Sequence, residues 1–348
     1  MGSIPEVSLA RRREILALET GDEAHPRLLA QLGFDAALEI SPPPRGEPEP
    51  LAEPLRVVAW NAQRARDPGA SAAMLAATGA RVFLLSELDH GMARSGQRHA
   101  TRELAARLGC GYAFGIEFLE LGLGDVRERE AHAGAENAVG YHGGAILSPS
   151  AFTQTALVRL ERSGRWFDGA LGERRVGGRI AVLGRLPVGS GEVAFASVHL
   201  ESHSDPGERA AQLAAVFDSL DAFAPGAAAL VGGDVNTHSL GRAELSDRAL
   251  LARALEADPR RLAEPILHEP LFALAEARGF EWRGCNAVGS STERRTRGEA
   301  SRRGVLALDW FFTRGLEVSE PEVIDAVDPR IGTALSDHEA IALTIRCR

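Results

Sequence analysis

The sequence predicts an α/β protein in which β-sheets pack against each other and helices cover the outside. Apolar runs of strand length alternate with helical patterns from Leu55 onward. The expected strands outnumber the expected helices, and hairpin-like neighbours mix with crossover units, which favours packed sheets over a helical bundle. The length of 348 residues fits one large domain or two ordinary ones.

The first 54 residues differ in composition from the rest of the chain. Residues 1–40 carry two short amphipathic patterns, Ser8–Leu18 and Glu23–Leu32, each too short to form a stable helix alone. Residues 41–54 are rich in Pro and Glu, as expected for an extended linker. We therefore expect an N-terminal helical extension over 1–40, a Pro-rich linker over 41–54 and the main domain over 55–348.

The main domain begins with an apolar run that is typical of a buried strand. Further runs predict the remaining strands, of which two are joined across Pro187–Gly191 as in a hairpin. The expected strands are Leu55–Trp60, Arg81–Ser86, Tyr112–Phe118, Gly144–Ser148, Ile180–Leu186, Glu192–Leu200, Ala227–Gly232, Val305–Thr313 and Glu339–Ile345. The expected helices are Ala70–Thr78, Gln97–Leu108, Pro206–Phe223 and Arg242–Leu255.

The charged composition excludes several chemistries. All 39 basic residues are Arg, and they face 48 acidic residues, so the net charge is −9. Without Lys, neither Schiff-base catalysis nor a Walker-A phosphate loop is possible. The acidic balance also disfavours non-specific binding to nucleic acid, which depends on basic side chains that neutralise phosphates.

Cysteine usage and hydropathy indicate a cytoplasmic protein. Cys110, Cys285 and Cys347 are far apart and lack CxxC spacing, so neither a disulfide framework nor a zinc site is expected. No apolar run reaches the roughly 18 residues of a membrane span. The first residues lack the basic and apolar regions of a secretory signal.

Polar side chains that interrupt apolar runs gather at the ends of the expected strands. Side chains at strand ends of α/β proteins line a common crevice. One such residue alone is more often a turn residue or a satisfied core histidine, but the repetition indicates a shared site. The residues are Asn61, Glu87, His199, Asp234, Asn236, Asp309, Asp337 and His338.

Short motifs surround these residues in a specific order along the chain. They are WN at Trp60–Asn61, SE at the end of Leu84–Glu87, GGAILS at Gly143–Ser148, SVHL at Ser197–Leu200, GGDVN at Gly232–Asn236, LDW at Leu308–Trp310 and SDH at Ser336–His338. Together they resemble the endonuclease/exonuclease/phosphatase family. The resemblance implies a two-sheet α/β sandwich of the DNase I-like type, with helices on the outer faces and the active site at one edge.

The resemblance also implies a metal site. Asn61 and Glu87 match metal-binding positions of the family, and Asp337 lies where the family often adds a further carboxylate. These ligands are carboxylate and amide oxygens, which suit Mg²⁺ or Mn²⁺ better than Zn²⁺. We expect Mg²⁺ (or Mn²⁺) as the cofactor, because a divalent ion neutralises charge on the phosphoryl oxygens and the leaving group.

Five further residues match catalytic positions of the family. Asp234 and Asn236 match the pair that activates and orients the attacking water. His199 and His338 match the histidines that flank the phosphate, and Asp309 matches the carboxylate that orients His338. A carboxylate fixes the tautomer of a histidine and stabilises the imidazolium, so that the ring can donate to a phosphate oxygen.

One motif departs from the family pattern. Many members carry Asn before AILS, where this chain has Gly144. A phosphate contact is then missing unless Tyr141 or His142 replaces it, which makes His142 a candidate for substrate binding. A structural role for the segment fits the sequence equally well.

The loop after Glu87 holds the other candidates for substrate binding, Arg94, Arg98 and His99. Family members commonly place recognition residues in this loop, and cationic side chains near a metal suit a second anionic group. Arg94 is the stronger candidate, because Arg98 and His99 also fit the start of an exposed helix. The run Glu117–Glu120 fits either a carboxylate that contacts substrate or a solvated strand end.

Residues Arg283–Arg303 form the most basic stretch of this acidic chain. The stretch fits a nucleic-acid grip, although it lacks aromatic interleaving beyond Trp282, and it fits a flexible surface loop about as well. The function it would support, a DNA or RNA nuclease of the same family, is therefore the alternative interpretation.

We expect a Mg²⁺- or Mn²⁺-dependent phosphoric ester hydrolase, specifically a phosphodiesterase that uses in-line attack by an activated water. A non-catalytic scaffold that retained the fold is the alternative of another class. It is disfavoured because a binding-only protein has no physical need for all the retained polar residues. The net charge of −9 and the Arg94–His99 loop favour a small phosphoester over nucleic acid as the substrate.

Overall fold

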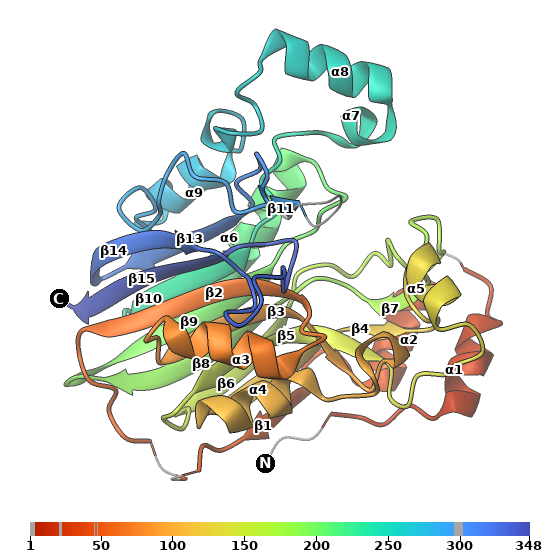
Figure 1. Cartoon of the computed structure of the whole chain (residues 1–348), viewed down its shortest axis with the longest axis horizontal. Coiled ribbons are helices and arrows are strands. Elements are labelled where there is room, and N and C mark those ends of the chain that lie inside the picture. Colours follow the sequence, from red (N-terminus) through yellow and green to blue (C-terminus); the bar gives the residue numbers. More distant parts are fainter. Residues whose placement is uncertain (1–3, 21–22, 45, 47, 296–301) are drawn as a thin grey trace.

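Two β-sheets packed face to face form the centre of the computed structural model, which describes residues 4–20, 23–44, 46, 48–295 and 302–348 (Figure 1). Within these residues the first sheet lies in the order β1 (Leu38–Ser41), β4 (Gly111–Glu120), β5 (Tyr141–Ser148), β3 (Val82–His90), β2 (Leu55–Arg64), β15 (Ala340–Cys347) and β14 (Leu316–Ile324), with β7 (Arg175–Gly177) beside β4. The second lies in the order β13 (Asp309–Arg314), β10 (Ala228–Asp234), β9 (Gly191–His199), β8 (Ile180–Val188) and β6 (Gln154–Arg159).

The helices lie outside the two sheets (Figure 1). They are α1 (Leu9–Leu16), α2 (Ala24–Leu32), α3 (Pro68–Ala77), α4 (Ala100–Leu108), α5 (Val126–Ala131), α6 (Pro206–Phe223), α7 (Arg242–Ser246), α8 (Arg248–Ala257) and α9 (Leu271–Ala277). Two short 3₁₀ helices span Ala93–Ser95 and Pro265–Leu267, and β11 (Arg294–Arg295) pairs with β12 (Arg302–Arg303). None of the described helices is both long and apolar enough for a membrane span.

Alternation of side chains along the strands builds the layers. In β2, Val57 and Ala59 enter the core between the sheets, whereas Val58 and Trp60 pack in the outer core that contains residues of α3 and α4. Successive strand residues point to opposite faces, so a strand that is apolar at every position is buried on both sides. The expected two-sheet sandwich with outer helices is confirmed.

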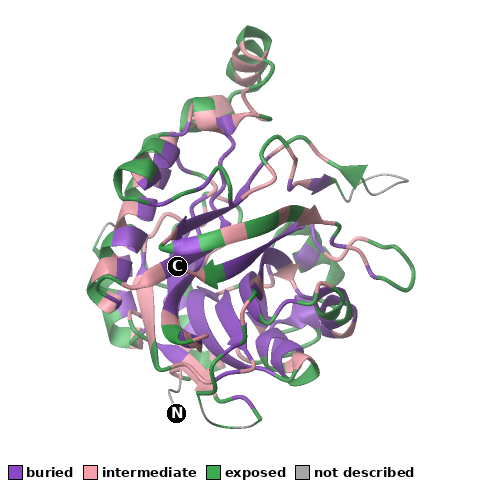
Figure 2. Ribbon diagram, turned by 90° about the vertical axis from the view of Figure 1, so that its left-hand side faces the viewer, coloured by how far each residue is buried: buried purple, intermediate pink, exposed green. Residues whose placement is uncertain are grey.

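The second sheet is covered by α6 and α9. Leu213 and Phe217 of α6 pack with Leu271 of α9 and with the outward residues of β9 and β10. In contrast, α7 and α8 contain no buried residue and extend away from the sheets at the top of Figures 1 and 2. The expected helix Arg242–Leu255 is divided at Asp247, whose side chain caps α8 by accepting the N–H groups of Ala249 and Leu250.

The N-terminal region contributes a strand to the first sheet, which corrects the expected boundary at residue 40. Strand β1 pairs with β4 from Leu38 to Ser41, so the boundary at 40 falls inside an edge strand. Ile15, Leu28 and Phe34 are buried in the outer core of the first sheet. The sequence pattern does not predict the strand Leu38–Ser41, because four residues give too little periodicity to identify a strand.

Candidate active site

Strand register in the second sheet brings three of the predicted catalytic residues together. Asp234, at the end of β10, lies opposite His199 of the parallel strand β9 and opposite Asp309 of the antiparallel strand β13. Residues directly opposite in neighbouring strands point to the same face. The three buried side chains therefore form a row at one edge of the sandwich.

The first sheet supplies Asn61 and Glu87 to the same edge. The Asn61 amide nitrogen donates hydrogen bonds to Glu87 Oε1 at 3.2 Å and to Asp234 Oδ2 at 3.0 Å, and so connects the two sheets. A register shift between Leu85 and Leu88 marks a bulge, in which Glu87 adopts a left-handed backbone with φ of 54°. The bulge re-aims Glu87, as bulges beside functional sites commonly do.

The segment before β15 completes the site. Ser336 Oγ donates to the Asn61 carbonyl oxygen at 2.7 Å and accepts the His338 backbone N–H at 3.0 Å. His338 Nδ1 lies 2.8 Å from Asp309 Oδ2, and its Nε2 lies 3.7 Å from Asp234 Oδ2. Asp234, Asp309 and His338 offer ligand or proton-bearing atoms that all lie within 4.8 Å of one another.

Electrostatics favour a protonated His338. Burial alone would lower the pKa of His338, but the carboxylates of Asp309 and Asp234 outweigh it and raise this pKa well above its usual value. Burial, with the nearby charge of Asp309, raises the pKa of Asp234. An imidazolium beside a proton-accepting carboxylate is an arrangement suited to acid–base chemistry.

His199 is held by two residues that sequence reasoning did not assign to it, Glu117 and Arg179. His199 Nδ1 lies 3.1 Å from Glu117 Oε2, and Arg179 forms an ion pair with the same carboxylate. Burial and Arg179 oppose protonation, yet Glu117 raises the pKa of His199 overall. Glu117 is fully buried inside the largely apolar strand β4, and a carboxylate flanked by Ile116 and Phe118 in such a run was the available signal.

Asn236 is positioned by the backbone around Asp234. Its N–H donates to Asp234 Oδ1 at 2.9 Å, and its side-chain amide donates to the Leu200 carbonyl oxygen at 3.0 Å. The backbone of Asn236 is left-handed, with φ of 52°, a conformation that Asn tolerates better than most residues. The residue therefore lies at the same edge as the carboxylates and histidines.

The carboxylates in this site match the chemistry of a hard divalent ion. Burial, together with the charge of Glu87, raises the pKa of Asp337. The second oxygen of Asp309 is buried without a hydrogen-bond partner among the described residues. Arg64 pairs with Glu87 Oε2, so one cation already lies near the first sheet's carboxylate. Further positive charge is needed to neutralise the remaining carboxylates, and oxygen donors of this type suit Mg²⁺ or Mn²⁺.

Arg94 and His142 lie beneath the site and are not open to a ligand. The Arg94 side chain is fully buried and makes two 2.9 Å hydrogen bonds to Asp89, with Glu120 and Glu128 at 3.3 and 3.2 Å. His142 is buried and lies 2.8 Å from the same Asp89. The expectation that Arg94 receives a second anion is corrected, because acidic side chains already surround its guanidinium.

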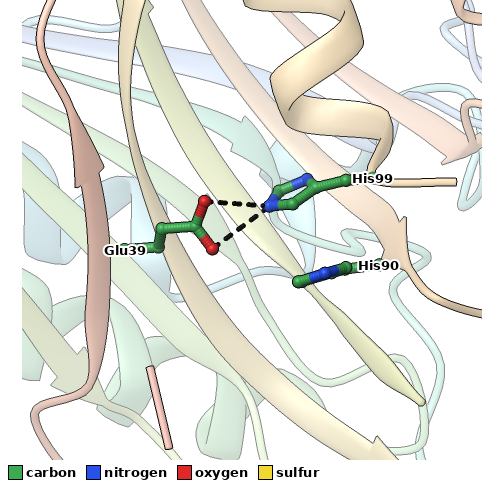
Figure 3. Close-up of side chains that lie close together, drawn as sticks. All are labelled: Glu39, His90 and His99. Atoms are coloured by element: carbon green, nitrogen blue, oxygen red, sulfur yellow. Dashed lines mark hydrogen bonds and ion pairs between the residues drawn. The ribbon is translucent and has the colours of Figure 1, made fainter. Parts of the chain in front are cut away.

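His99 lies in a different group of side chains (Figure 3). Its Nε2 lies 3.1 Å from Glu39 Oε1, and its ring stacks on His90 with centroids 3.8 Å apart. Arg98 is exposed on the preceding turn. The structure therefore does not bring His99 together with the strand-end residues, and His99 instead caps α4 by accepting the Arg102 N–H.

Two other sequence features have structural partners. Gly144 lies in β5 opposite Gly115, and the Tyr141 hydroxyl donates to the Pro5 carbonyl oxygen, so this hydroxyl already has a partner within the fold. In the Arg283–Arg303 stretch, Arg294 and Arg303 form ion pairs with Asp325 at 2.9 and 3.1 Å. Arg297 lies outside the described residues. Much of this stretch is therefore neutralised within the protein.

Comparisons with known proteins identify the fold. No family model and no curated protein sequence matches the chain. Among solved structures, an endonuclease/exonuclease/phosphatase from Beutenbergia cavernae is 18% identical with a TM-score of 0.53, covering 84% of this chain and 71% of that chain. A functionally unknown conserved protein from Enterococcus faecalis (13%, TM-score 0.55) and an endonuclease/exonuclease/phosphatase from Bacteroides vulgatus (12%, TM-score 0.52) each match 84% of this chain, over 100% and 99% of their own length. The chain therefore has the DNase I-like fold of endonuclease/exonuclease/phosphatase proteins.

Proposed function

We propose that this protein is a divalent-metal-dependent phosphoester hydrolase, specifically a phosphodiesterase. One observation carries the proposal: residues from both sheets, spread from Asn61 to His338, converge as paired carboxylates and histidines at one edge of the sandwich. A non-catalytic scaffold would gain nothing from this convergence, because unpaired buried carboxylates cost stability.

The proposed roles follow from the contacts. Asp234 and Asn236 orient the attacking water, and the Asp234 carboxylate accepts its proton, which the raised pKa of Asp234 favours. His338 lies beside Asp234, and as an imidazolium held by Asp309 it donates a hydrogen bond to a phosphoryl oxygen. His199, held by Glu117, stabilises the same group from the other side.

Glu87, Asn61 and Asp337 are the residues that would hold Mg²⁺ or Mn²⁺. When bound, the ion would supply positive charge against the phosphoryl oxygens and the leaving group. The Asn61 amide nitrogen donates to both Glu87 and Asp234, so carboxylates from the two sheets lie close together at this edge. With no Lys in the chain, permanent positive charge beside these residues comes from Arg, as at Arg64 and Arg179.

We propose a small phosphoester as the substrate, in preference to a long polynucleotide. Two facts support this preference: the net charge is −9, and Arg294 and Arg303 of the basic stretch are paired with acidic residues. Tight duplex binding requires several phosphates to be neutralised by free basic side chains. A nuclease is the rival interpretation, and the substrate panel below decides between them.

The test is a panel of phosphodiesters, phosphomonoesters, oligonucleotides and plasmid DNA, assayed with Mg²⁺, with Mn²⁺ and with EDTA at ~0.15 M salt, near physiological ionic strength. We expect turnover of small phosphodiesters that EDTA abolishes. Turnover that persists after exhaustive chelation contradicts the metal requirement. Faster cleavage of plasmid than of the small esters, lost when Arg295 and Arg302 are replaced by Gln, identifies a nuclease instead.

A further inference from the structure

A cavity of about 220 Å³ lies beside His203, four residues after the predicted catalytic residue His199. It is formed by the loop after β6, the turn after β9 and helix α7, and it is lined by Arg165, Ala170, Leu171, His203, Arg242, Leu245 and Ser246. Such a volume holds a short chain or a single ring rather than a polymer. The exposed helix α7 therefore forms one wall of this cavity.

The lining combines apolar side chains with two guanidinium groups. Leu171 and Leu245 provide the apolar side, and Leu245 is 40% exposed, so part of its surface is available to a ligand. Arg165 and Arg242 provide guanidinium groups. No acidic residue is among the described lining residues, in contrast to the cleft around Asp337, whose described lining includes five carboxylates.

The charge in the cavity is only partly neutralised. Arg165 and Arg242 share one carboxylate, Glu208, at 2.7 and 3.5 Å. Two guanidinium groups against one carboxylate leave one positive charge beside an apolar wall. The Arg165 Nε atom is also buried without a hydrogen-bond partner in the described part of the chain. This combination is complementary to an anionic group carried on an apolar body.

A short series of contacts joins the cavity to the candidate active site. The backbone N–H of His203 donates to Glu201 Oε1 at 2.9 Å, and Arg179 Nε lies 3.1 Å from the other oxygen of the same carboxylate. Arg179 in turn contacts His199 at 3.0 Å. Two buried residues, Glu201 and Arg179, therefore connect the cavity wall to the histidine that is proposed to face the phosphoester.

We propose that this cavity binds the part of the substrate beyond the scissile phosphoester, and that it selects an apolar chain ending in an anionic group. The proposal rests on the proposed phosphodiesterase function and names its substrate class. The apolar chain lies against Leu171 and Leu245, and the terminal carboxylate or phosphate binds Arg242 and Arg165. The substrate is then a small phosphodiester with a second acidic group.

The test compares three 4-nitrophenyl phosphodiesters whose other alcohol is a six-carbon chain ending in a methyl group, a carboxylate or a phosphate. We expect kcat/KM to be about fivefold to tenfold higher for an anionic ester than for the methyl-terminated ester, the effect of one partly exposed charge-assisted hydrogen bond. The carboxylate and phosphate arms show which anion is preferred. Calorimetry with hexyl phosphate and 6-phosphonooxyhexanoate gives a readout without turnover.

Two variants and a control locate the effect. Arg242→Gln should reduce the preference for the anionic esters to less than about twofold, and Leu245→Asn should weaken binding of hexyl phosphate by about threefold to tenfold. Arg253→Gln, on exposed α8 and outside the cavity lining, should keep the wild-type preference.

The outcomes separate the two proposals. Equal kcat/KM for all three esters, with equal calorimetric affinities, overturns the cavity assignment and leaves the phosphodiesterase function standing. A preference that survives undiminished in Arg242→Gln also overturns it, whatever Arg253→Gln does. If no ester is hydrolysed under any metal condition, the proposed function fails, and calorimetry then decides whether the cavity still binds an anionic chain.

Discussion

Two histidine–carboxylate groups lie on opposite faces of the first sheet, and they differ in how their charges are balanced. Glu39, His90 and His99 lie on the outer face, and Figure 3 shows His99 bonded to Glu39. Tyr112 and Arg102 also donate to Glu39. The other group, around His338, lies between the sheets, where Asp234 and Asp309 both face one histidine.

The comparison shows that the surroundings of a histidine decide what it can do. At His338 the charges of Asp309 and Asp234 outweigh the effect of burial, so the pKa of His338 is raised and the ring can act as an acid. At His90 burial, reinforced by the neighbouring His99, lowers the pKa to about 4. The Glu39 carboxylate is already bonded by His99, Arg102 and Tyr112, so this group connects β1 to the start of α4.

The largest expected difference is in turnover. His338→Ala should lower kcat by roughly 10²–10⁴, the range for a lost acid–base group. His99→Ala, the matched change in the outer group, should lower kcat less than about twofold, because His99 contacts Glu39 and not the candidate active site. Steady-state kinetics on a small phosphodiester measure both. Equal losses would mean that the two groups do not differ in function.

The next effect concerns the carboxylate that holds His338. Asp309→Asn should lower kcat by about 10–100-fold, since it removes the charge that keeps His338 protonated. Because it acts through the same ring, the double variant with His338→Ala should be little worse than His338→Ala alone. Kinetics of the three variants complete the cycle, and additive losses would show that Asp309 and His338 work independently.

Metal binding should separate the groups further. Glu87→Gln should raise the apparent Mn²⁺ dissociation constant about tenfold or more, because it removes a charged oxygen ligand. Glu39→Gln should leave it unchanged, since Glu39 is occupied by donors from Tyr112 and Arg102. Titration calorimetry with Mn²⁺ reads both values. An unchanged constant in Glu87→Gln would exclude Glu87 as a ligand.

The smallest expected effect is on stability, with opposite pH dependence in the two groups. The lowered pKa of His90 means that the unfolded chain takes up a proton before the folded protein does, so stability falls as the pH drops from about 6.5 toward 4. The lowered pKa of Glu39 adds a loss at still lower pH. At His338 the raised pKa stabilises the fold below pH ~6.5 and loses that effect as the pH rises through the folded value.

Thermal unfolding tests the outer group. Wild-type Tm should fall by about 2–4 °C between pH 7 and pH 5 because of His90, and His90→Gln should show a smaller decrease. Comparison of the wild type with His90→Gln at constant ionic strength removes the contribution of the other acidic residues. An identical decrease in His90→Gln would assign the acid sensitivity to a different group.

Much of the fold and of the candidate site could be predicted, because the information is local. Apolar runs at strand length predicted β2, β3, β10 and β15, and polar residues at their ends predicted Asn61, Glu87 and Asp234. The short β1, which lacks a strong period, escaped prediction. The division of the expected helix at Asp247 could have been predicted from Ser-Asp, a pair typical of helix caps.

Other features depended on partners that are distant in sequence. Arg94 has the composition of an anion-binding residue, but Glu120 and Glu128 neutralise it. Glu117 and Arg179 are 62 residues apart, and only the packing of β4 against the second sheet brings them to His199. Sequence by itself determined which strands form and which polar residues end them, because side-chain alternation is a property of neighbours. The tertiary structure alone decided which charges remain unpaired, because electrostatic balance depends on every group within a few ångströms in space.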